Sequence, residues 1–143
     1  MNVIPVDARG RVILIRQSRY GSRRVELEIP GGAVDRRDAS PLAAAKRELM
    51  EETGCVAKKW ISLGFVNPNP AFHRNKCHMF LALGVRKLAR QTLDDAEDIT
   101  ITPVPLRDIP GLIRRGRISH SIVIAAFFCM HDKLGLLRSP SRR

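Results

Sequence analysis

The sequence predicts a mixed α/β fold for a single domain, and three observations support this class. The chain has 143 residues, of which 44% are hydrophobic and 27% charged, which are ordinary values for a domain with a buried core. Short apolar segments with strand-like alternation surround two segments with helical signals. Strands and helices do not alternate regularly, unlike those of a doubly wound sheet. We expect the domain over residues 1–137 and a polar, basic, disordered tail over residues 138–143.

The first third of the chain predicts three strands and a loop. Two apolar segments, 3–6 and 11–16, flank the turn-forming residues 7–10, which is the pattern of a hairpin. Residues 25–29 alternate with a period of two and stop at the helix- and strand-breaking residues Pro30, Gly31 and Gly32. A loop is expected from there to Ala39.

The next segment predicts a helix with well-defined ends. Ser40 is expected to cap it and Pro41 to occupy its first position, where the missing N–H of proline costs nothing. The helix should run to Thr53 and stop at Gly54.

The remaining elements are predicted from apolar runs and breakers. Strands are expected at residues 60–66, 76–85 and 99–104. Residues 106–115 predict a short helix or a pair of turns broken by Pro110 and Gly111. Ser119 is expected to cap a last apolar helix that runs through His131.

The strong positive charge of the chain is compatible with nucleic acid, a membrane surface or a polyphosphate ligand as partner. The formal net charge is +11, from 25 basic and 14 acidic residues. The basic residues are scattered and aromatic residues make up only 5%, whereas nucleic-acid binders cluster their charge and add exposed aromatics. Nucleic acid is therefore not the expected main partner. Composition alone does not separate a site for small anions from a general preference for arginine.

Membrane and secretory signals are not found. The longest apolar run, 122–130, is about half of the roughly 20 residues that span a membrane. The first residues lack the charged-then-apolar layout of a signal peptide. Three cysteines, Cys55, Cys77 and Cys129, are an odd number without paired spacing. We expect no membrane partner and a cytoplasmic location.

The expected helix at 41–53 carries the strongest chemical signal. Three of the six glutamates in the chain, Glu48, Glu51 and Glu52, share an arc of about 100° on it. Converging carboxylates repel one another unless a cation intervenes, and Mg²⁺ prefers such oxygen ligands. Arg47, four residues before Glu51, is placed to orient or neutralise it. The alternative is a solvated acidic face, but the helix dipole disfavours acids near the C-terminal end.

Residues 32–55 resemble the Nudix box, G-x5-E-x7-R-E-U-x-E-E-x-G-U, where U is a bulky aliphatic residue. Residues 47–55 match its second half at nearly every fixed position. The first half departs from it, because Gly32 stands one residue too far from Arg47. Ala39 occupies the position of the usual glutamate, or Asp38 replaces that glutamate if the loop bulges. The glutamate normally supports the loop, so the change bears on loop rigidity more than on metal binding.

Further segments resemble the ADP-ribose pyrophosphatase branch of this family, namely residues 16–20, 26–32, 93–99 and 116–120. The resemblance implies a Nudix-type α/β/α sandwich with a mixed central sheet. That branch usually carries extra N-terminal strands, which in several members build a dimer and part of the substrate pocket. Here Met1 lies only a few residues before the first expected strand, and a homodimer is left open.

The resemblance implies a metal-dependent pyrophosphohydrolase. Its expected substrate is ADP-ribose or a related nucleoside diphosphate sugar, cleaved to a nucleoside monophosphate and a phosphorylated product. The implied cofactor is Mg²⁺ or Mn²⁺, held by Glu48, Glu51, Glu52 and the Gly31 carbonyl. The implied catalytic residues are Glu51, Glu52, Glu97 and Arg47. Glu97 lies in an acidic run, 94–98, whose alternative interpretation is a solvated turn.

Four residues are candidates for substrate binding. Arg16 and Arg19 suit phosphate because a guanidinium binds it with two parallel hydrogen bonds. Glu28 belongs to the resembled motif before the glycine pair. Phe72 is available to stack on a base or ribose, and its alternative is a place in a small satellite core.

Two other functions stay open at this point. A related enzyme of dinucleotide polyphosphates or capped RNA would suit the basic charge. A non-catalytic nucleotide-binding module would need none of the three helix glutamates, and their presence argues against it.

Overall fold

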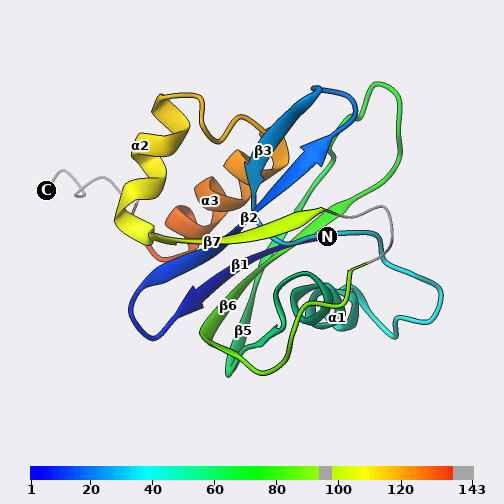
Figure 1. Ribbon diagram of the computed structural model, residues 1–143. Helices are drawn as coiled ribbons and strands as arrows, with labels where there is room; N and C mark the ends of the chain where they lie inside the picture. Colours follow the sequence, from blue (N-terminus) through cyan, green and yellow to red (C-terminus); the bar gives the residue numbers. More distant parts are fainter. Residues whose placement is uncertain (94–97, 137–143) are drawn as a thin grey trace, which may run out of the picture.

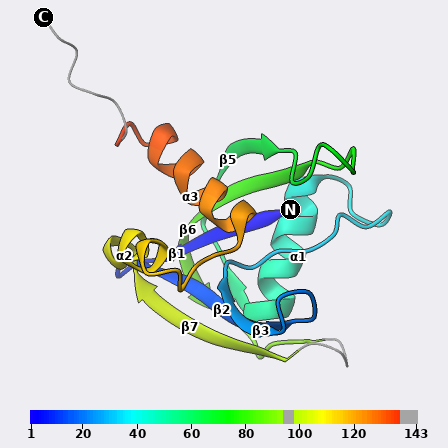
Figure 2. The same ribbon diagram turned by 90° about the horizontal axis from the view of Figure 1, so that it is seen from above.

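The computed structural model describes residues 1–93 and 98–136, which form a mixed seven-stranded sheet with helices on both faces (Figures 1 and 2). The strands are β1 (Asn2–Asp7), β2 (Arg11–Arg19), β3 (Arg24–Glu28), β4 (Cys55–Val56), β5 (Lys59–Val66), β6 (Cys77–Lys87) and β7 (Ile99–Pro105). The helices are α1 (Pro41–Thr53), α2 (Ile109–Arg114) and α3 (Ser121–Lys133), with a 3₁₀ turn at Leu106–Asp108.

The sheet runs in the order β3-β2-β1-β6-β4, with β5 paired to β6 and β7 paired to β2. β1 and β6 pair in parallel, and the other pairs are antiparallel. Figure 2 shows α1 on one side of the sheet and α2 and α3 on the other. The predicted α/β/α sandwich with a mixed central sheet is therefore confirmed.

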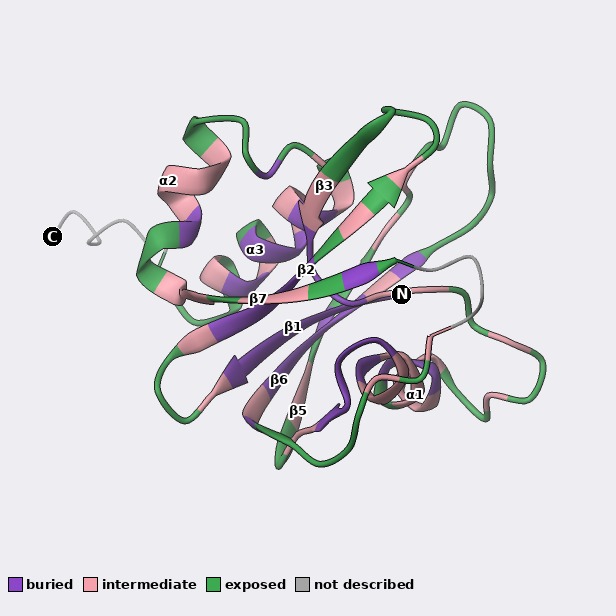
Figure 3. Cartoon of the chain, in the orientation of Figure 1, coloured by how far each residue is buried: buried purple, intermediate pink, exposed green. Residues whose placement is uncertain are grey.

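The sheet has an apolar core on each face because its central strands are buried on both sides (Figure 3). In β1, Ile4 and Val6 join the core beneath α2 and α3, whereas Val3 joins the core beneath α1. This alternation follows from the period of two in a strand. Burial on both faces explains why β1 and β2 read as nearly continuous apolar runs in the sequence.

α1 has the bounds that the sequence predicts. The Ser40 hydroxyl accepts a hydrogen bond from the Ala43 amide at 3.1 Å, which caps the helix. Gly54 ends it with φ +65°, and a Cβ there would clash with the Ala89 carbonyl. The face formed by Ala45, Leu49 and Thr53 is buried against the sheet, as the helical period requires.

Two local predictions near the C-terminus are wrong. The short helix expected within residues 106–115 is present as α2, but Pro110 and Gly111 do not break it, because Pro110 lies in its first turn, where a helix needs no N–H donor. Ser119 does not cap α3, whose N-cap is His120 without a side-chain bond. The Ser119 hydroxyl instead donates to Oε2 of Glu26 at 3.1 Å. Contacts with a distant strand therefore override the local capping preference.

No helix among the described residues is long and apolar enough to span a membrane. Glu97 and the tail expected at 138–143 lie outside the described residues.

Candidate active site

Glu52 lies at the contact between α1 and the loop that follows β3. Its side chain is buried, with 2% of the residue exposed, and Oε2 accepts a hydrogen bond from the Gly31 amide at 3.0 Å. Helical periodicity places Glu48 one turn earlier on the same face, with 13% of its side chain exposed. Two of the predicted glutamates therefore face the glycine pair, as their position at the edge of the buried face predicts.

The two glycines let the loop approach α1 closely. A Cβ on Gly32 would clash with the Glu48 carboxylate, and a Cβ on Gly31 would lie 2.5 Å from the Met1 carbonyl oxygen. Gly31 also forms a β-bridge with Asn2. These contacts place the Gly31 backbone, the predicted source of a ligand carbonyl, next to the Glu52 carboxylate.

Arg47 connects the acidic face of α1 to the preceding loop. Its Nε and Nη2 donate to the Asp38 carboxylate at 3.2 and 2.9 Å, and Nη2 also donates to the Ala33 carbonyl. Its Nη1 donates to Glu51 at 2.8 Å and to Glu48 at 3.0 Å. The bonds with Asp38, opposed by partial burial and reinforced by Glu51 and Glu48, raise the pKa of Arg47, so it stays charged.

Asp38 takes the place of the glutamate that the Nudix-box pattern puts at Ala39. Its Oδ2 also accepts from the Asp35 amide at 2.8 Å, which closes a turn within the loop. Hydrogen bonding from Arg47 lowers the pKa of Asp38, so the carboxylate is ionised. Asp38 thus links the loop to Arg47 one position before Ala39, where the resembled pattern has its glutamate.

The donor atoms of this face suit a hard divalent cation. Glu48, Glu51, Glu52 and the Gly31 carbonyl all offer oxygen, and Mg²⁺ and Mn²⁺ prefer oxygen ligands. Among the described residues, no three acidic, histidine or cysteine side chains are gathered as closely as the ligands of one bound ion. Glu48 and Glu51 instead contact the Arg47 guanidinium. The donor atoms therefore match the predicted metal in chemistry, but in this structure Arg47 holds two of the carboxylates and they do not surround one point.

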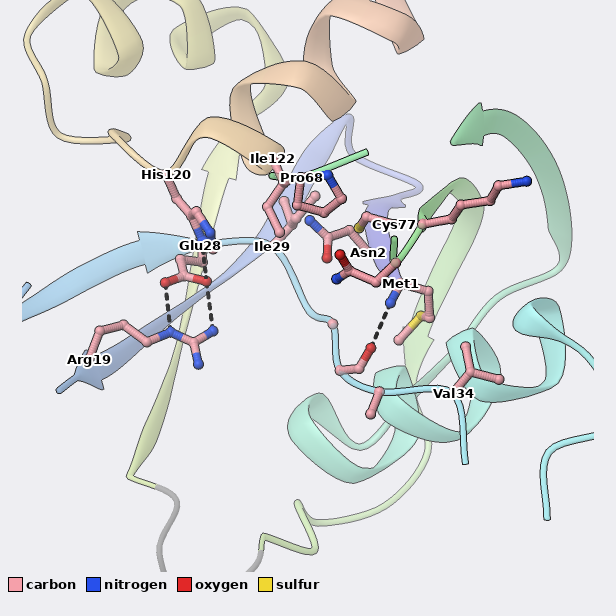
Figure 4. Close-up of a pocket in the computed structure, with 15 residues that line it drawn as sticks. Met1, Asn2, Arg19, Glu28, Ile29, Val34, Pro68, Cys77, His120 and Ile122 are labelled. Carbon is pink, nitrogen blue, oxygen red and sulfur yellow. Dashed lines mark hydrogen bonds and ion pairs between the residues drawn. The ribbon is translucent and has the colours of Figure 1, made fainter. Parts of the chain in front are cut away.

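A pocket of about 510 Å³ opens beside the glycine pair (Figure 4). Gly31 and Gly32 form part of its wall, and Arg19, Glu28 and His120 form another part. Its apolar lining includes residues that are far apart in the sequence, namely Met1, Ile29, Val34, Pro68, Cys77 and Ile122. The glycine turn thus has the carboxylates of α1 on one side and a partly apolar pocket on the other.

Glu28 is a buried carboxylate with two cationic or basic neighbours in this wall. Arg19 donates to it twice, from Nε at 2.9 Å and from Nη2 at 2.8 Å. His120 Nδ1 lies 3.1 Å from Oε2 but lacks the alignment of a hydrogen bond. Burial alone would raise the pKa of Glu28, but the Arg19 bonds and His120 outweigh it and lower that pKa to about 2. Glu28 is therefore charged at neutral pH.

The sequence missed the part that His120 plays here. His120 precedes α3 and lies next to Glu28 in the pocket wall. A hydrogen bond from Ser119 to Glu26, 93 positions away in sequence, joins the segment before α3 to β3. A second pocket of about 460 Å³ shares Arg19, Glu28 and His120 with the first. A resembled segment at 116–120 was the available signal, but it did not assign a role to the histidine.

Arg16 and Arg19, paired as phosphate ligands in the prediction, lie on opposite faces of β2. They are three positions apart in a strand, so their side chains point to opposite sides. Arg19 lines the large pocket, whereas Arg16 lines a separate pocket of about 200 Å³ that also contains Asp98. The structure does not bring the two arginines to one site.

Phe72 is 81% exposed, which excludes the alternative that it packs in a satellite core. It lies between β5 and β6, in the same connection as Pro68, Asn75 and Lys76, which do line the large pocket. A role of Phe72 in stacking on substrate stays a prediction.

Comparisons with known proteins identify a family and several relatives. Residues 1–127 match the NUDIX domain family. The chain is 33% identical over 112 residues to the ADP-ribose pyrophosphatase of Bacillus subtilis, an alignment that covers 78% of this chain and 60% of that protein. It is 28% identical over 127 residues to the methanol dehydrogenase activator of Bacillus methanolicus, covering 87% of this chain and 67% of the relative.

Two further similarities concern another hydrolase and a solved structure. The chain is 30% identical over 115 residues to a CMP-5'-(N-acetyl-N-hydroxy-3-aminopropyl)phosphonate hydrolase of Streptomyces rubellomurinus, covering 80% of this chain and 55% of that protein. A solved structure described as an ADP compounds hydrolase superposes with a TM-score of 0.82 at 24% identity, covering 96% of this chain and 74% of that one. This last likeness concerns the fold.

The chain spans 55% to 67% of the length of these curated relatives. The family match, in contrast, extends over residues 1–127 of 143 and includes the loop, α1 and its glutamates. The chain belongs to the NUDIX domain family.

Proposed function

We propose that this protein is a metal-dependent pyrophosphohydrolase that cleaves ADP-ribose or a related nucleoside diphosphate sugar. The observation that carries the proposal is the position of the Gly31–Gly32 turn between the acidic face of α1 and the pocket of about 510 Å³. A diphosphate at this turn is next to the carboxylates, while its organic groups have a pocket to enter. Similarity to the Bacillus subtilis ADP-ribose pyrophosphatase supports the choice of substrate.

The proposed metal ligands are Glu48, Glu51, Glu52 and the Gly31 carbonyl. A bound Mg²⁺ or Mn²⁺ neutralises the charge of a diphosphate and lowers the pKa of a water molecule. Glu52 is already positioned by its bond from the Gly31 amide, and burial restricts its movement. Arg47 holds Glu51 and Glu48 on the same side of α1, so its role is to position them.

The proposed substrate contacts come from the pocket wall. The Arg19 side chain is 41% exposed, while two of its guanidinium nitrogens are fixed by Glu28. It can therefore attract phosphate without losing its orientation. The apolar side chains of Ile29, Pro68 and Ile122 offer a surface for a base or a ribose. Phe72 lies outside this pocket, in the same connection as Pro68, and stays a candidate for substrate contact. Arg16 lines a separate pocket on the other face of β2 and is not included among the proposed contacts.

A substrate panel tests the proposal directly. The protein is incubated with ADP-ribose, other nucleoside diphosphate sugars and dinucleotide polyphosphates, each with Mg²⁺ or Mn²⁺, and release of AMP is followed by chromatography. We expect AMP and ribose 5-phosphate from ADP-ribose, loss of turnover in EDTA and recovery with excess metal. Binding of ADP-ribose without hydrolysis at saturating metal would make the protein a nucleotide-binding module. A marked preference for dinucleotide polyphosphates or capped RNA would replace the proposed substrate.

A further inference from the structure

A basic pocket of about 460 Å³ lies at the opposite end of β1 from the candidate active site. Asn2, at the start of β1, forms a bridge with Gly31, whereas Asp7, at the end of β1, lines this basic pocket. Five residue steps separate them, which is about 17 Å in a strand. The β1–β2 turn and the end of β6 supply two walls of the pocket. They lie side by side because β1 and β6 pair in parallel, with Asp7 opposite Val85 (Figure 1).

The pocket concentrates positive charge. Its rim carries four basic residues, Arg9, Arg11, Arg86 and Lys87. Asp7 is the one carboxylate in the lining, and it already accepts bonds from the Arg11 side chain at 2.8 Å and from the Arg9 and Arg11 amides at 2.9 Å. Four cations against one satisfied carboxylate leave an excess of about three positive charges, which attracts an anion.

Two of these cations have no ionic partner within the described part of the chain. No described carboxylate forms an ion pair with Arg9 or Arg86. Lys87 donates to the Thr53 carbonyl at 3.0 Å, which fixes its position near the end of α1 and leaves its charge unneutralised. Both exposed guanidinium groups are therefore available to bind phosphate.

The floor of the pocket is apolar. Ile13, Val85 and Cys55 form it, and all three belong to the core between the sheet and α1. Ile101 of β7 extends the same surface. A ligand recognised only through its backbone charges, such as RNA, needs an exposed basic stripe rather than a concave apolar floor. A small molecule that combines phosphate with a flat or apolar body uses both parts of the pocket, and the volume is in the range of such sites.

We propose that this pocket is a second binding site, for a small organic monophosphate of the nucleoside monophosphate kind. Arg9 and Arg86 bind the phosphate group, and the apolar body lies over Ile13 and Val85. The site shares no lining residue with the pocket beside Gly31 and does not depend on the proposed hydrolysis.

The test maps binding residue by residue. The ¹⁵N-labelled protein is titrated with AMP in EDTA, where turnover is suspended, and amide chemical shifts are followed by NMR. We expect saturable shifts at Arg9, Arg11, Arg86 and Lys87. The double variant Arg9→Ala/Arg86→Ala should weaken this binding by at least about tenfold, because two charge-assisted hydrogen bonds are lost.

A matched control removes the same charge elsewhere. Arg114 and Arg117 are exposed near α2 and line none of the pockets next to Gly31 or Arg9. The variant Arg114→Ala/Arg117→Ala should bind AMP like the wild type, and both double variants should keep the wild-type turnover of ADP-ribose. Circular dichroism checks the folds; if the Arg9/Arg86 double variant does not fold, Arg9→Ala alone carries the test.

Three results would overturn the proposal. Shifts confined to Gly31 and Gly32 would place AMP at the candidate active site alone. Inorganic phosphate with the same affinity as AMP would reduce the pocket to a general anion site. A single-stranded RNA oligonucleotide that displaces AMP from the pocket, with an affinity that collapses as salt rises, would identify RNA as the partner. Loss of hydrolysis in an active-site variant affects none of these readouts.

Discussion

Arg47 and Asp38 are joined by two hydrogen bonds, Nε to Oδ1 at 3.2 Å and Nη2 to Oδ2 at 2.9 Å. The same guanidinium uses its remaining Nη1 for Glu48 and Glu51. One side chain therefore fixes the loop before α1 and two of the proposed metal ligands at once. Asp38 performs this task although the Nudix-box pattern places a glutamate one residue later, at Ala39.

The first prediction concerns Asp38→Asn. Asparagine removes the negative charge and replaces one of the two acceptor oxygens by an NH2 donor, so the loop loosens and the guanidinium shifts toward Glu48 and Glu51. We expect a lower Tm and a loss of about 10- to 100-fold in metal affinity or turnover. Asp35→Asn is the matched control, because Asp35 is more exposed and lies 3.7 Å from Arg47. Equal effects of the two substitutions would show that Asp38 has no special role.

The second prediction is that Glu52→Gln abolishes turnover and preserves the fold. Glutamine keeps nearly the same volume and retains a carbonyl oxygen that accepts the bond from the Gly31 amide. It removes one negative charge from the proposed metal site, and repulsion among the carboxylates falls, so the Tm should hold or rise slightly.

Steady-state kinetics and thermal denaturation check this variant together. Asp132→Asn, at an exposed position of α3, is the control for loss of one negative charge. Wild-type turnover by Glu52→Gln at saturating Mg²⁺ would mean that Glu52 is not a ligand of the essential ion.

The third prediction is an acid-dependent loss of stability through Glu28. Its pKa is about 2 in the folded protein and 4.5 in the unfolded reference, so its ionised form favours folding. This contribution is complete above pH 4.5, is lost as the pH falls toward 2, and amounts to about 3 kcal/mol at pH 7.

Urea denaturation of the wild type and of Glu28→Gln measures this contribution. At pH 7 the variant should be less stable, because Arg19 and His120 lose their charged partner. Between pH 4.5 and 2.5 the difference in the free energy of unfolding should shrink as the wild-type carboxylate becomes protonated. A difference that is independent of pH would disprove the role of the charge.

The fourth prediction concerns Glu97, which lies outside the described residues. The prediction rests on the resemblance to the ADP-ribose pyrophosphatase branch. A glutamate in that run is expected to act as base or ligand, and Glu97 reaches one methylene further than its aspartate neighbours. Glu97→Gln should lower kcat by a factor on the order of 10² with little change in KM, as for a group that acts in the transition state. With kcat within a few-fold of the wild type, the base would have to be sought at Glu51 or Glu28.

The sequence alone determined the elements whose signals are local. The bounds of α1 follow from Ser40, Pro41 and Gly54, which are adjacent in sequence to the helix they limit. The shared face of Glu48 and Glu52 follows from the helical period, and the mixed α/β class follows from short apolar strand segments around helical ones. Each of these signals is contained within a few neighbouring residues.

Only the tertiary structure decided which distant groups meet. β4 is two residues long and is defined by its pairing with β6, so the sequence shows no strand-like alternation that would predict it. α3 begins after the predicted cap Ser119, whose hydroxyl bonds to Glu26 of a distant strand. Arg19 of β2 forms hydrogen bonds to Glu28 of β3, whereas the Arg16 side chain points to the other face of the sheet. Such contacts depend on strand register and on loop closure over many residues, and local propensity carries no information about either.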